Sequence, residues 1–597
     1  MIPITWHAIL SAVAVAAAGR VALRAWRKLR RREIAIELLV TVAVAGALLL
    51  GEFWEAAAVA VLFLLGERLE ARALRHTRRA TSRLIDLMPQ GAVVLREGVP
   101  VEVTVDQVGA GDVLLIRAGA RIPVDGEVVD GHAAVDESPI TGESLPAEKS
   151  RGSKAYAGTI NRDGTLWMRA TGVGVETALA RIARRVEEAL EQKTPAQRLI
   201  DRFARWYTPL IIALAILAFL LTQRIELALT LLVIGCPGAL VIATPAAVMA
   251  GIGRAAQLGI LIKGGAHLEI AGTISALAFD KTGTLTEGRP RLTDVSPLEP
   301  SGDHPASPDA PWTNAQKRIL KWAAVAEASS GHPIAQPIMA EAGRLGPLPC
   351  IQPSRSHAGR GVEASCGSHA VAVGSLELMR QAGAVVPPAA VFDLNRFSED
   401  GKTAVVAALD GRAIGVLAVA DAQRESACAM VKRLKSAGVS RIVMLTGDDR
   451  RAADAVARKL GIDEVHAGLL PSGKLQLVRE MQAEGEIVAM VGDGINDAPA
   501  LAAADVGIAM GIGATDLAAE TADIVIMTND LVKIPEAIRI ARATVRIMWQ
   551  NIAIAMLTVA GLLAGVATGS VHMATGMLVH EMSVLIVTLN AIRLLRA

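Results

Sequence analysis

Seven apolar runs separated by three polar blocks constrain the fold of this 597-residue chain more than any other feature. The runs cover residues 4–18, 36–50, 54–65, 208–221, 225–250, 552–567 and 573–589. A helix needs about 20 mostly apolar residues to cross a bilayer, and most of these runs approach that length. The third run is shorter, and a buried helix is the alternative for it. Apolar residues make up 52% of the chain, so we expect a multidomain α-helical membrane protein.

Basic side chains gather after two of these runs. The first cluster is Arg24, Arg27, Lys28, Arg30, Arg31 and Arg32, and the second is Arg68, Arg72, Arg75, Arg78 and Arg79. Arginine and lysine beside a span favour the cytoplasmic side of the membrane. Two predicted crossings separate the clusters, so both are expected on that side.

Composition excludes several classes of protein. The net charge is only +2, so the chain has no global attraction to nucleic acid. Aromatic residues are 3%, too few for base-stacking platforms. The four cysteines are scattered without a Cys-x-x-Cys pair, which argues against a disulfide framework and against a cysteine-based zinc domain.

The polar blocks predict distinct domains. Residues 86–175 alternate apolar and polar positions between Gly and Asp turns, which predicts a small β-rich domain. An amphipathic helix is expected over residues 175–190. Residues 290–415 form an inserted block that begins with a Pro/Ser-rich linker at 296–311.

The remaining block is split in sequence by this insert. Short apolar strands are expected at 274–279, 441–445 and 487–491, and helical segments at 427–437 and 454–460 alternate with them. This alternation predicts a parallel sheet with crossover helices.

Asp280 stands at the end of the first of these strands and opens the heptad Asp-Lys-Thr-Gly-Thr-Leu-Thr. Ligands bind at the carboxyl ends of strands in open α/β sheets. A carboxylate there is able to attack a phosphoryl group and become an aspartyl phosphate. Lys281 and the small hydroxyl residues after it are suited to line an anion pocket. A surface turn is the alternative for a lone Asp-Lys pair, and it does not account for the whole heptad.

Two other strand ends carry polar residues. Thr446 follows the second strand, and Asp493 and Asp497 follow the third. Mg²⁺ prefers one or two carboxylates together with phosphate and water, and these two aspartates are spaced to share it. Lys474 lies between the two strand ends, where it and Thr446 are suited to neutralise a transferred phosphoryl group.

The heptad resembles the phosphorylation motif of the P-type ATPases, and almost the whole chain resembles the heavy-metal-transporting, type IB, members. The resemblance is closest to the cobalt, zinc, cadmium and iron(II) subgroup. It implies a haloacid-dehalogenase-like phosphorylation domain with a Rossmann-like sheet, an α+β nucleotide-binding insert and a β-rich actuator domain. The implied divisions are 1–85 (membrane helices), 86–195 (actuator), 196–255 (membrane helices), 256–292 with 416–540 (phosphorylation), 293–415 (nucleotide binding) and 541–597 (membrane helices).

The resemblance also assigns roles around the phosphorylated aspartate. ATP would phosphorylate Asp280, with the catalytic residues Lys281, Thr282, Thr446 and Lys474 and with Asn496 around it. Mg²⁺ would be held by Asp280, Thr282, Asp493 and Asp497. Glu143 lies in a Thr-Gly-Glu-Ser sequence that resembles the dephosphorylation loop of the actuator, and it would orient a water.

The inserted block resembles the nucleotide-binding domain of the same class. ATP would bind at Glu327, His332, Gly359 and Gly361. Asp421 and Arg424 match a family pair near the hinge into the phosphorylation domain, and a surface ion pair is the alternative for them.

Cys236, His580 and Glu581 are expected to bind the transported ion. Cys236-Pro237-Gly238 lies inside an apolar run, and proline should break the helix there. A kinked helix with an inert buried cysteine is the alternative. His580 and Glu581 lie in the last run, where ionisable residues cost free energy and are functional candidates. The alternative for His580 and Glu581 is a position at the membrane interface, in contact with water.

One thiolate, one imidazole and one carboxylate suit a borderline divalent ion such as Zn²⁺, Cd²⁺, Co²⁺ or Fe²⁺. The resemblance therefore implies ATP-driven export by a monomer in a membrane, expected to be a bacterial inner membrane. The alternatives are a copper(I) exporter that uses Met556, Met577 or Met582, a potassium-type pump subunit and a non-transporting metal sensor.

The chain departs from the family in three respects. It has Gly238 where a second cysteine is usual, about seven membrane segments instead of eight, and no amino-terminal metal-binding motif before the first run.

Overall fold

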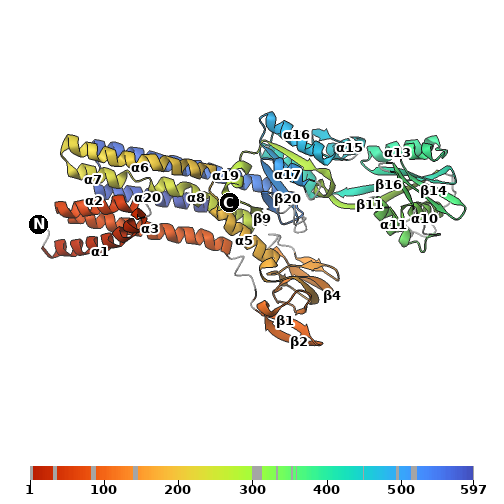
Figure 1. The fold of residues 1–597 in the computed structure, drawn as a ribbon, viewed down its shortest axis with the longest axis horizontal. Helices are drawn as coiled ribbons and strands as arrows, with labels where there is room; N and C mark the ends of the chain where they lie inside the picture. Colours follow the sequence, from red (N-terminus) through yellow and green to blue (C-terminus); the bar gives the residue numbers. More distant parts are fainter. Residues whose placement is uncertain are drawn as a thin grey trace. The chain divides into compact units, whose positions relative to one another are not determined.

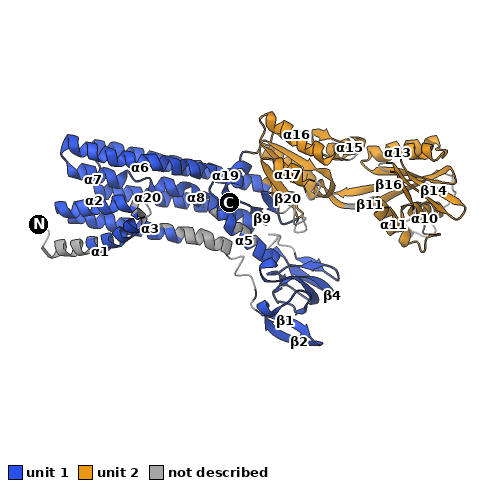
Figure 2. Ribbon diagram, in the orientation of Figure 1, with its two compact units in different colours: residues 1–273, 523–528, 536–597 blue, residues 274–522, 529–535 orange. Residues whose placement is uncertain are grey.

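The computed structural model describes most of the chain as two compact units. The described residues are 4–30, 36–82, 89, 91–138, 146–298, 312–330, 334–350, 354–357, 360–447, 450–492, 497–511 and 521–595. The first unit comprises residues 1–273, 523–528 and 536–597, and the second comprises 274–522 and 529–535 (Figure 2).

Long helices run alongside one another in the first unit (Figure 1). They are α1 (Ile4–Leu29), α2 (Ile36–Leu50), α3 (Phe53–Ser82), α6 (Pro195–Thr222), α7 (Ile225–Ile234), α8 (Gly238–Gln257), α19 (Lys533–Ala567) and α20 (Met573–Ile592). Each apolar run predicted from the sequence lies in one of them or in the α7–α8 pair. Among the described residues, four helical stretches are long and apolar enough to cross a membrane: Glu187–Thr222, Ile225–Gln257, Lys533–Ala567 and Met573–Leu595.

The helix break predicted at Cys236-Pro237-Gly238 is confirmed. Helix α7 ends at Ile234, where the N–H of Gly235 donates to the carbonyl of Leu231 at 2.8 Å. Helix α8 begins at Gly238, and the carbonyl of Pro237 accepts from the residues that open its first turn. Proline carries no N–H and clashes with the preceding turn, which favours a break at this point. Proline does not end every helix of this chain, since Pro209 lies inside α6 and Pro245 inside α8. Cys236 is thereby placed in a non-helical link between two buried helices.

A sheet of eight strands forms the β-rich domain of the first unit. Its order is β2-β1-β3-β8-β4-β5, and β6 and β7 pair with β4. The strands are β1 (Gly91–Arg96), β2 (Val99–Thr104), β3 (Val113–Ile116), β4 (Asp125–Asp136), β5 (Ala147–Lys149), β6 (Lys154–Ala155), β7 (Ile160–Asn161) and β8 (Thr165–Gly172). Leu114, Leu166 and Met168 are fully buried between them. The expected amphipathic helix follows as α5 (Ala178–Glu191).

A parallel sheet lies in the second unit, outside the inserted block. Its strands there run in the order β18 (Glu464–His466), β17 (Arg441–Leu445), β10 (Ala276–Asp280), β19 (Val488–Gly492) and β20 (Val506–Met510). Helices α14 (Ser426–Ser436), α15 (Arg450–Leu460), α16 (Pro471–Ala483) and α17 (Ala498–Ala503) connect or follow them. Strands buried on both faces read as continuous apolar runs, which is why the sequence predicts this sheet correctly.

An antiparallel sheet of six strands forms the insert. Its order is β11 (Thr286–Pro297), β16 (Arg412–Gln423), β15 (Thr403–Leu409), β14 (His369–Gly374), β13 (Gly361–Cys366) and β12 (Arg355–His357). Helices α10 (Asn314–Glu327), α11 (Ala335–Gly343), α12 (Leu376–Gln381) and α13 (Pro388–Glu399) accompany it. The paired strands β11 and β16 lead from the parallel sheet into the insert and back (Figure 1).

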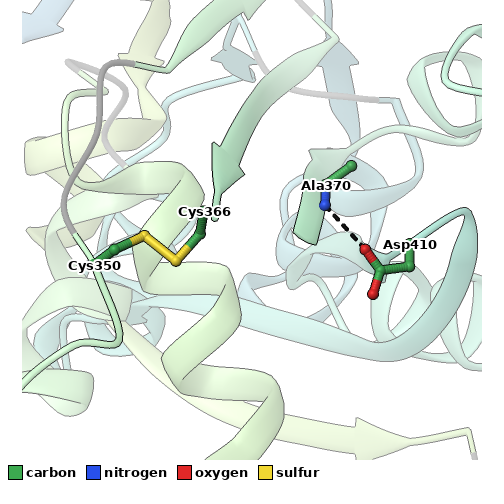
Figure 3. Close-up of a disulfide and its surroundings, with 4 residues drawn as sticks. All are labelled: Cys350, Cys366, Ala370 and Asp410. Atoms are coloured by element: carbon green, nitrogen blue, oxygen red, sulfur yellow. Dashed lines mark hydrogen bonds between the residues drawn. A yellow bond between two sulfur atoms is a disulfide. The ribbon is translucent and has the colours of Figure 1, made fainter. Parts of the chain in front are cut away.

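A disulfide in the insert joins Cys350 to Cys366 at the end of β13 (Figure 3). The sequence analysis argued against a disulfide framework and did not foresee this single bond. Their Cα atoms lie 6.0 Å apart, within the usual range for a disulfide. Spacing along the chain does not reveal this approach, because the fold of the insert brings the two residues together. Cys236 and Cys428 remain free thiols.

One ion pair ties adjacent strands of the parallel sheet. The guanidinium of Arg441 donates twice to Glu464, at 2.7 and 2.8 Å, and also pairs with the more exposed Glu484. The bonds from Arg441 outweigh partial burial and lower the pKa of Glu464 to about 2. A depressed carboxyl pKa stabilises the fold above its ordinary value near 4.5, and that contribution is lost as the pH falls towards 2.

We therefore predict that Glu464→Gln lowers the free energy of unfolding by about 1 kcal/mol at pH 7, because the pair is partly exposed and screened by solvent. Glu484→Gln, which removes a more exposed and single bond, is the matched comparison and should cost less. Thermal unfolding between pH 7 and pH 3 measures both effects. The deficit of Glu464→Gln should shrink below pH 4.5, and a deficit that stays constant with pH would contradict this account.

Candidate functional site

Three charged side chains meet at the carboxyl edge of the parallel sheet. Asp280 ends β10, Asp497 precedes α17 and Lys474 lies in the first turn of α16. The Lys474 ammonium donates to Oδ1 of Asp280 and, at 2.7 Å, to Oδ1 of Asp497. All three side chains are buried. The structure thus brings together three residues that the sequence analysis predicted at separate places in the chain.

The charges at this edge determine what it is able to bind. Burial alone would lower the pKa of Lys474, but the charges and hydrogen bonds of Asp280 and Asp497 outweigh it and raise that pKa. Lysine therefore stays charged at neutral pH. Two carboxylates share this one ammonium, so the oxygen-rich site suits a further hard cation such as Mg²⁺.

Asp497 reaches this position because Gly492 has no side chain. A Cβ at Gly492 would stand 2.8 Å from Oδ2 of Asp497, so any larger residue would displace the carboxylate. The other predicted Mg²⁺ ligand at this strand end is Asp493, and it lies outside the described residues, as does Asn496. The magnesium assignment therefore stays a prediction that the described geometry supports in part.

Thr446 lies at the same edge of the sheet. It follows Leu445, which is the register partner of Asp280 in the neighbouring strand. Its N–H donates to His466 at 3.0 Å and its carbonyl accepts from Leu469 at 3.0 Å, so its backbone is fixed and its side chain is buried. Lys281 is half-buried and Thr282 is exposed in the turn after Asp280.

Two residues from the end of β16 hold that turn. Asp421 accepts from the hydroxyl of Thr286 and from the N–H of Gly288 at 3.1 Å. Arg424 donates to the carbonyls of Gly283 at 2.8 Å and Thr284 at 2.9 Å. The sequence analysis left a surface ion pair open for Asp421 and Arg424, and the structure shows both bonded to the loop that follows Asp280.

The predicted nucleotide residues are described only in part. Glu327 is buried at the end of α10. Gly361 opens β13 with φ 139°, and a Cβ there would stand 2.1 Å from the carbonyl of Val373. The close pairing of β13 with β14 is therefore enough to require glycine at this position. His332, Gly359 and the actuator glutamate Glu143 lie outside the described residues.

The predicted ion residues lie around the helix break. Cys236 is 3% exposed and His580 on α20 is 4% exposed. Both side chains approach Gly238, while Glu581 packs against Gly66 of α3. Within the described part of the chain, no three His, Cys, Asp or Glu side chains lie close enough to form a metal cluster.

The sequence analysis missed one acidic residue near this site. The carboxylate of Glu37, at the start of α2, lies near enough to interact electrostatically with Cys236, as does that of Glu581. The available signal was a single acidic residue in the otherwise apolar run 36–50.

Two family models match the chain. A P-type ATPase actuator domain model matches residues 86–187, and a haloacid dehalogenase-like hydrolase model matches residues 274–505. These matches confirm the fold class expected for the β-rich domain and for the region that contains the parallel sheet.

Similar proteins cover the chain more fully. A probable cadmium-transporting ATPase of Staphylococcus aureus is 36% identical over 586 residues, which cover 96% of this chain and 79% of the relative. A probable copper-exporting P-type ATPase V of Mycobacterium tuberculosis is 43% identical over 510 residues, or 84% of this chain. This chain spans less than two thirds, 64%, of that relative's length. A solved zinc-transporting PIB-type ATPase in the E2.Pi state is 38% identical, with a TM-score of 0.60 over 99% of this chain and 95% of that chain.

The bonds from Arg424 lead to a prediction about the loop. Arg424→Ala removes two charge-assisted bonds to loop carbonyls, so local opening of residues 283–288 should become about 1–2 kcal/mol easier. Amide hydrogen exchange at Gly283 and Gly288 should then be roughly tenfold faster or more. Arg433→Ala on the exposed face of α14 is the control. Unchanged exchange in Arg424→Ala would show that the arginine does not hold the loop.

Proposed function

Because the chain belongs to the heavy-metal, type IB family of P-type ATPases, we propose that it exports a divalent transition-metal ion through an aspartyl-phosphate intermediate driven by ATP. The observation that carries this proposal is the position of Lys474, bonded to both Asp280 and Asp497 at the sheet edge. Such a site supplies a nucleophile, a fixed cation and a second carboxylate for Mg²⁺, which are the parts that phosphoryl transfer needs.

Asp280 performs the first chemical step. One of its carboxylate oxygens attacks the γ-phosphorus of ATP, the bond to the bridging oxygen breaks, and ADP leaves with that oxygen. The ammonium of Lys474 and the hydroxyl of Thr446 offset charge on the transferred group. Asp280, Thr282, Asp493 and Asp497 would hold Mg²⁺, which when bound neutralises phosphate oxygens.

The other roles follow from the family pattern. Glu327, His332, Gly359 and Gly361 would hold the nucleotide in the insert. Glu143 would orient the water that hydrolyses the aspartyl phosphate and returns Asp280 to its free carboxylate.

The cargo proposal rests on the residues at the helix break. A cysteine, a histidine and a carboxylate from Cys236, His580 and Glu581 suit Zn²⁺, Cd²⁺, Co²⁺ or Fe²⁺. The cadmium-transporting relative and the zinc-transporting structure support a divalent ion. We place the pump in a bacterial inner membrane, acting as a monomer with its sheet domains in the cytoplasm.

Copper(I) is the second candidate cargo, because a relative at 43% identity carries the name of a copper exporter. Copper(I) favours sulfur ligands. Met577 is buried, but Met556 and Met582 are 45% and 49% exposed. The methionines therefore form a weaker argument for copper than the relatives do.

The first test concerns the phosphorylated residue. The wild-type protein, incubated with radiolabelled ATP, Mg²⁺ and metal, should form an acid-stable, hydroxylamine-sensitive phosphoenzyme. Asp280→Asn should form none, because an amide is not a nucleophile of comparable strength. Asp410→Asn, which alters a carboxylate in the insert, is the control and should retain the signal. A hydroxylamine-sensitive phosphoenzyme in Asp280→Asn would refute the assignment.

The second test concerns the cargo. We expect Zn²⁺, Cd²⁺, Co²⁺ or Fe²⁺ to stimulate ATP hydrolysis more than Cu⁺, and Cys236→Ala and Glu581→Ala to lower the stimulation at least tenfold. Cys428→Ala, which removes the other free thiol, is the matched control and should behave as wild type. Stimulation by Cu⁺ alone would establish the copper alternative, and unchanged metal dependence in both variants would place the ion elsewhere.

A further inference from the structure

The disulfide between Cys350 and Cys366 closes a loop at one edge of the insert (Figure 3). Cys350 follows α11 in the chain, and Cys366 ends β13, 16 positions later. The closed loop contains the edge strand β12 and Gly361, the first residue of β13. The bond therefore tethers a segment that carries one of the predicted nucleotide residues.

Strand β12 is a short strand at the end of its sheet. It contains three residues, Arg355 to His357, and the first two of them are exposed. A partly exposed contact of 3.1 Å joins Nε2 of His357 to Oε2 of Glu363 on β13. Segments held by exposed hydrogen bonds open locally at a low cost in free energy, so the order of β12 depends on its anchors.

The residue before β12 joins this strand to the end of helix α10. The N–H of Ser354 donates to the hydroxyl of Ser329 at 2.8 Å, and the two hydroxyls are bonded at 2.7 Å. Ser329 is two residues beyond Glu327, which is a predicted nucleotide residue. Within the sheet, His357 of β12 is the register partner of Gly361. Strand β12 thus connects the segments that carry Glu327 and Gly361, so its anchoring affects how both are held.

The two cysteines differ in exposure. Cys366 is 7% exposed, whereas Cys350 is half-buried and more accessible to solvent. Thiol–disulfide exchange requires that a small molecule reach one of the sulfurs, and Cys350 offers that access. Disulfides in cytoplasmic proteins are rare and most often transient or redox-sensing. Because the proposed function places the insert in the cytoplasm, we expect this bond to form and break reversibly.

We propose that Cys350 and Cys366 form a redox modification site, in which a small-molecule disulfide of the glutathione class oxidises the pair and the new bond tightens ATP binding by tethering β12. This inference rests on the proposed function and specifies how its use of ATP is regulated. Thiols of that class also bind soft and borderline metal ions. Oxidation of the thiol pool would therefore release metal and raise the affinity of the pump for ATP at the same time.

The exchange balances in two steps. The thiolate of Cys350 attacks one sulfur of the small-molecule disulfide, the S–S bond of that molecule breaks, and its other half leaves as a thiolate. The thiolate of Cys366 then attacks the Cys350 sulfur of the mixed disulfide, and the second small thiolate leaves. The two protons from the cysteines end on these leaving groups, so two protein thiols are oxidised and one small disulfide is reduced to two thiols.

The first experiment measures the bond in the full-length protein. Samples equilibrated in glutathione buffers, from strongly reducing to strongly oxidising, are quenched with acid, alkylated and analysed by mass spectrometry. We expect the Cys350–Cys366 pair to change reversibly from alkylated thiols to a disulfide, while the free thiol of Cys428 forms no bond within the chain. A pair that stays bonded in the most reducing buffer, or that never bonds, would overturn the proposal.

The second experiment measures ATP binding to the same samples. The dissociation constant of a fluorescent ATP analogue should be about 3- to 10-fold lower for the oxidised protein, because less ordering of the tethered loop then accompanies binding. Amide hydrogen exchange at residues 354–357 should slow on oxidation. Equal ATP affinity in the two states of the wild-type protein would overturn the proposal, and this comparison does not depend on the folding of any variant.

Cysteine variants assign the response to this pair. Cys350→Ser should bind the ATP analogue in every buffer as the reduced wild-type protein does. Cys428→Ser, which removes a thiol outside the pair, is the matched control and should keep the full response. A redox response that persists in Cys350→Ser and disappears in Cys428→Ser would assign the effect to the other thiol and overturn the proposal.

These readouts separate the redox site from the proposed function. Metal-stimulated ATP hydrolysis with the same KM for ATP in both redox states would refute the redox site alone. Redox-dependent affinity for ATP in a protein that no metal stimulates would refute the transport function and support the redox site.

Discussion

The bonds from Lys474 to Asp280 and Asp497 are the interaction on which the catalytic edge of the molecule depends. Each carboxylate would be costly to bury alone, and removing one partner of such a network leaves an uncompensated charge. The ammonium of Lys474 compensates the charge of both carboxylates, and its bonds link three separate elements, β10, α16 and the start of α17. In the proposed reaction the ammonium that stabilises the resting site would also offset the charge of the transferred phosphoryl group, so stability and chemistry would depend on the same atoms.

Much of this edge was predictable from sequence, because strands buried on both faces leave an unmistakable apolar pattern and end in polar residues. Asp280 and Thr446 were placed correctly by that argument, and the proline at 237 located the helix break by removing a backbone donor. These are local signals, which depend on neighbouring residues only.

The features that sequence missed all depend on contacts between distant residues. The sequence analysis named Asp421 and Arg424 as a family pair, but their bonds to a loop about 140 residues earlier could not be predicted from the residues beside them in the chain. The Cys350–Cys366 disulfide is set by the fold of the insert. Glu37 comes near Cys236 only through helix packing. The approach of Cys236 and His580 to Gly238 is likewise visible only once α20 is packed against α8.

The central strand of the phosphorylation sheet has a consequence for how the protein is made. Ser275, just before β10, bonds to Ser440, 165 positions later, because the whole insert lies between β10 and its partner β17. At about 5–20 residues per second, a ribosome takes on the order of 10–30 s to add that stretch. During this interval an apolar strand with both edges unpaired waits in the cytoplasm, where it is prone to aggregate. During synthesis, this strand therefore needs protection, either by a chaperone that binds it or by early folding of the insert as an independent body.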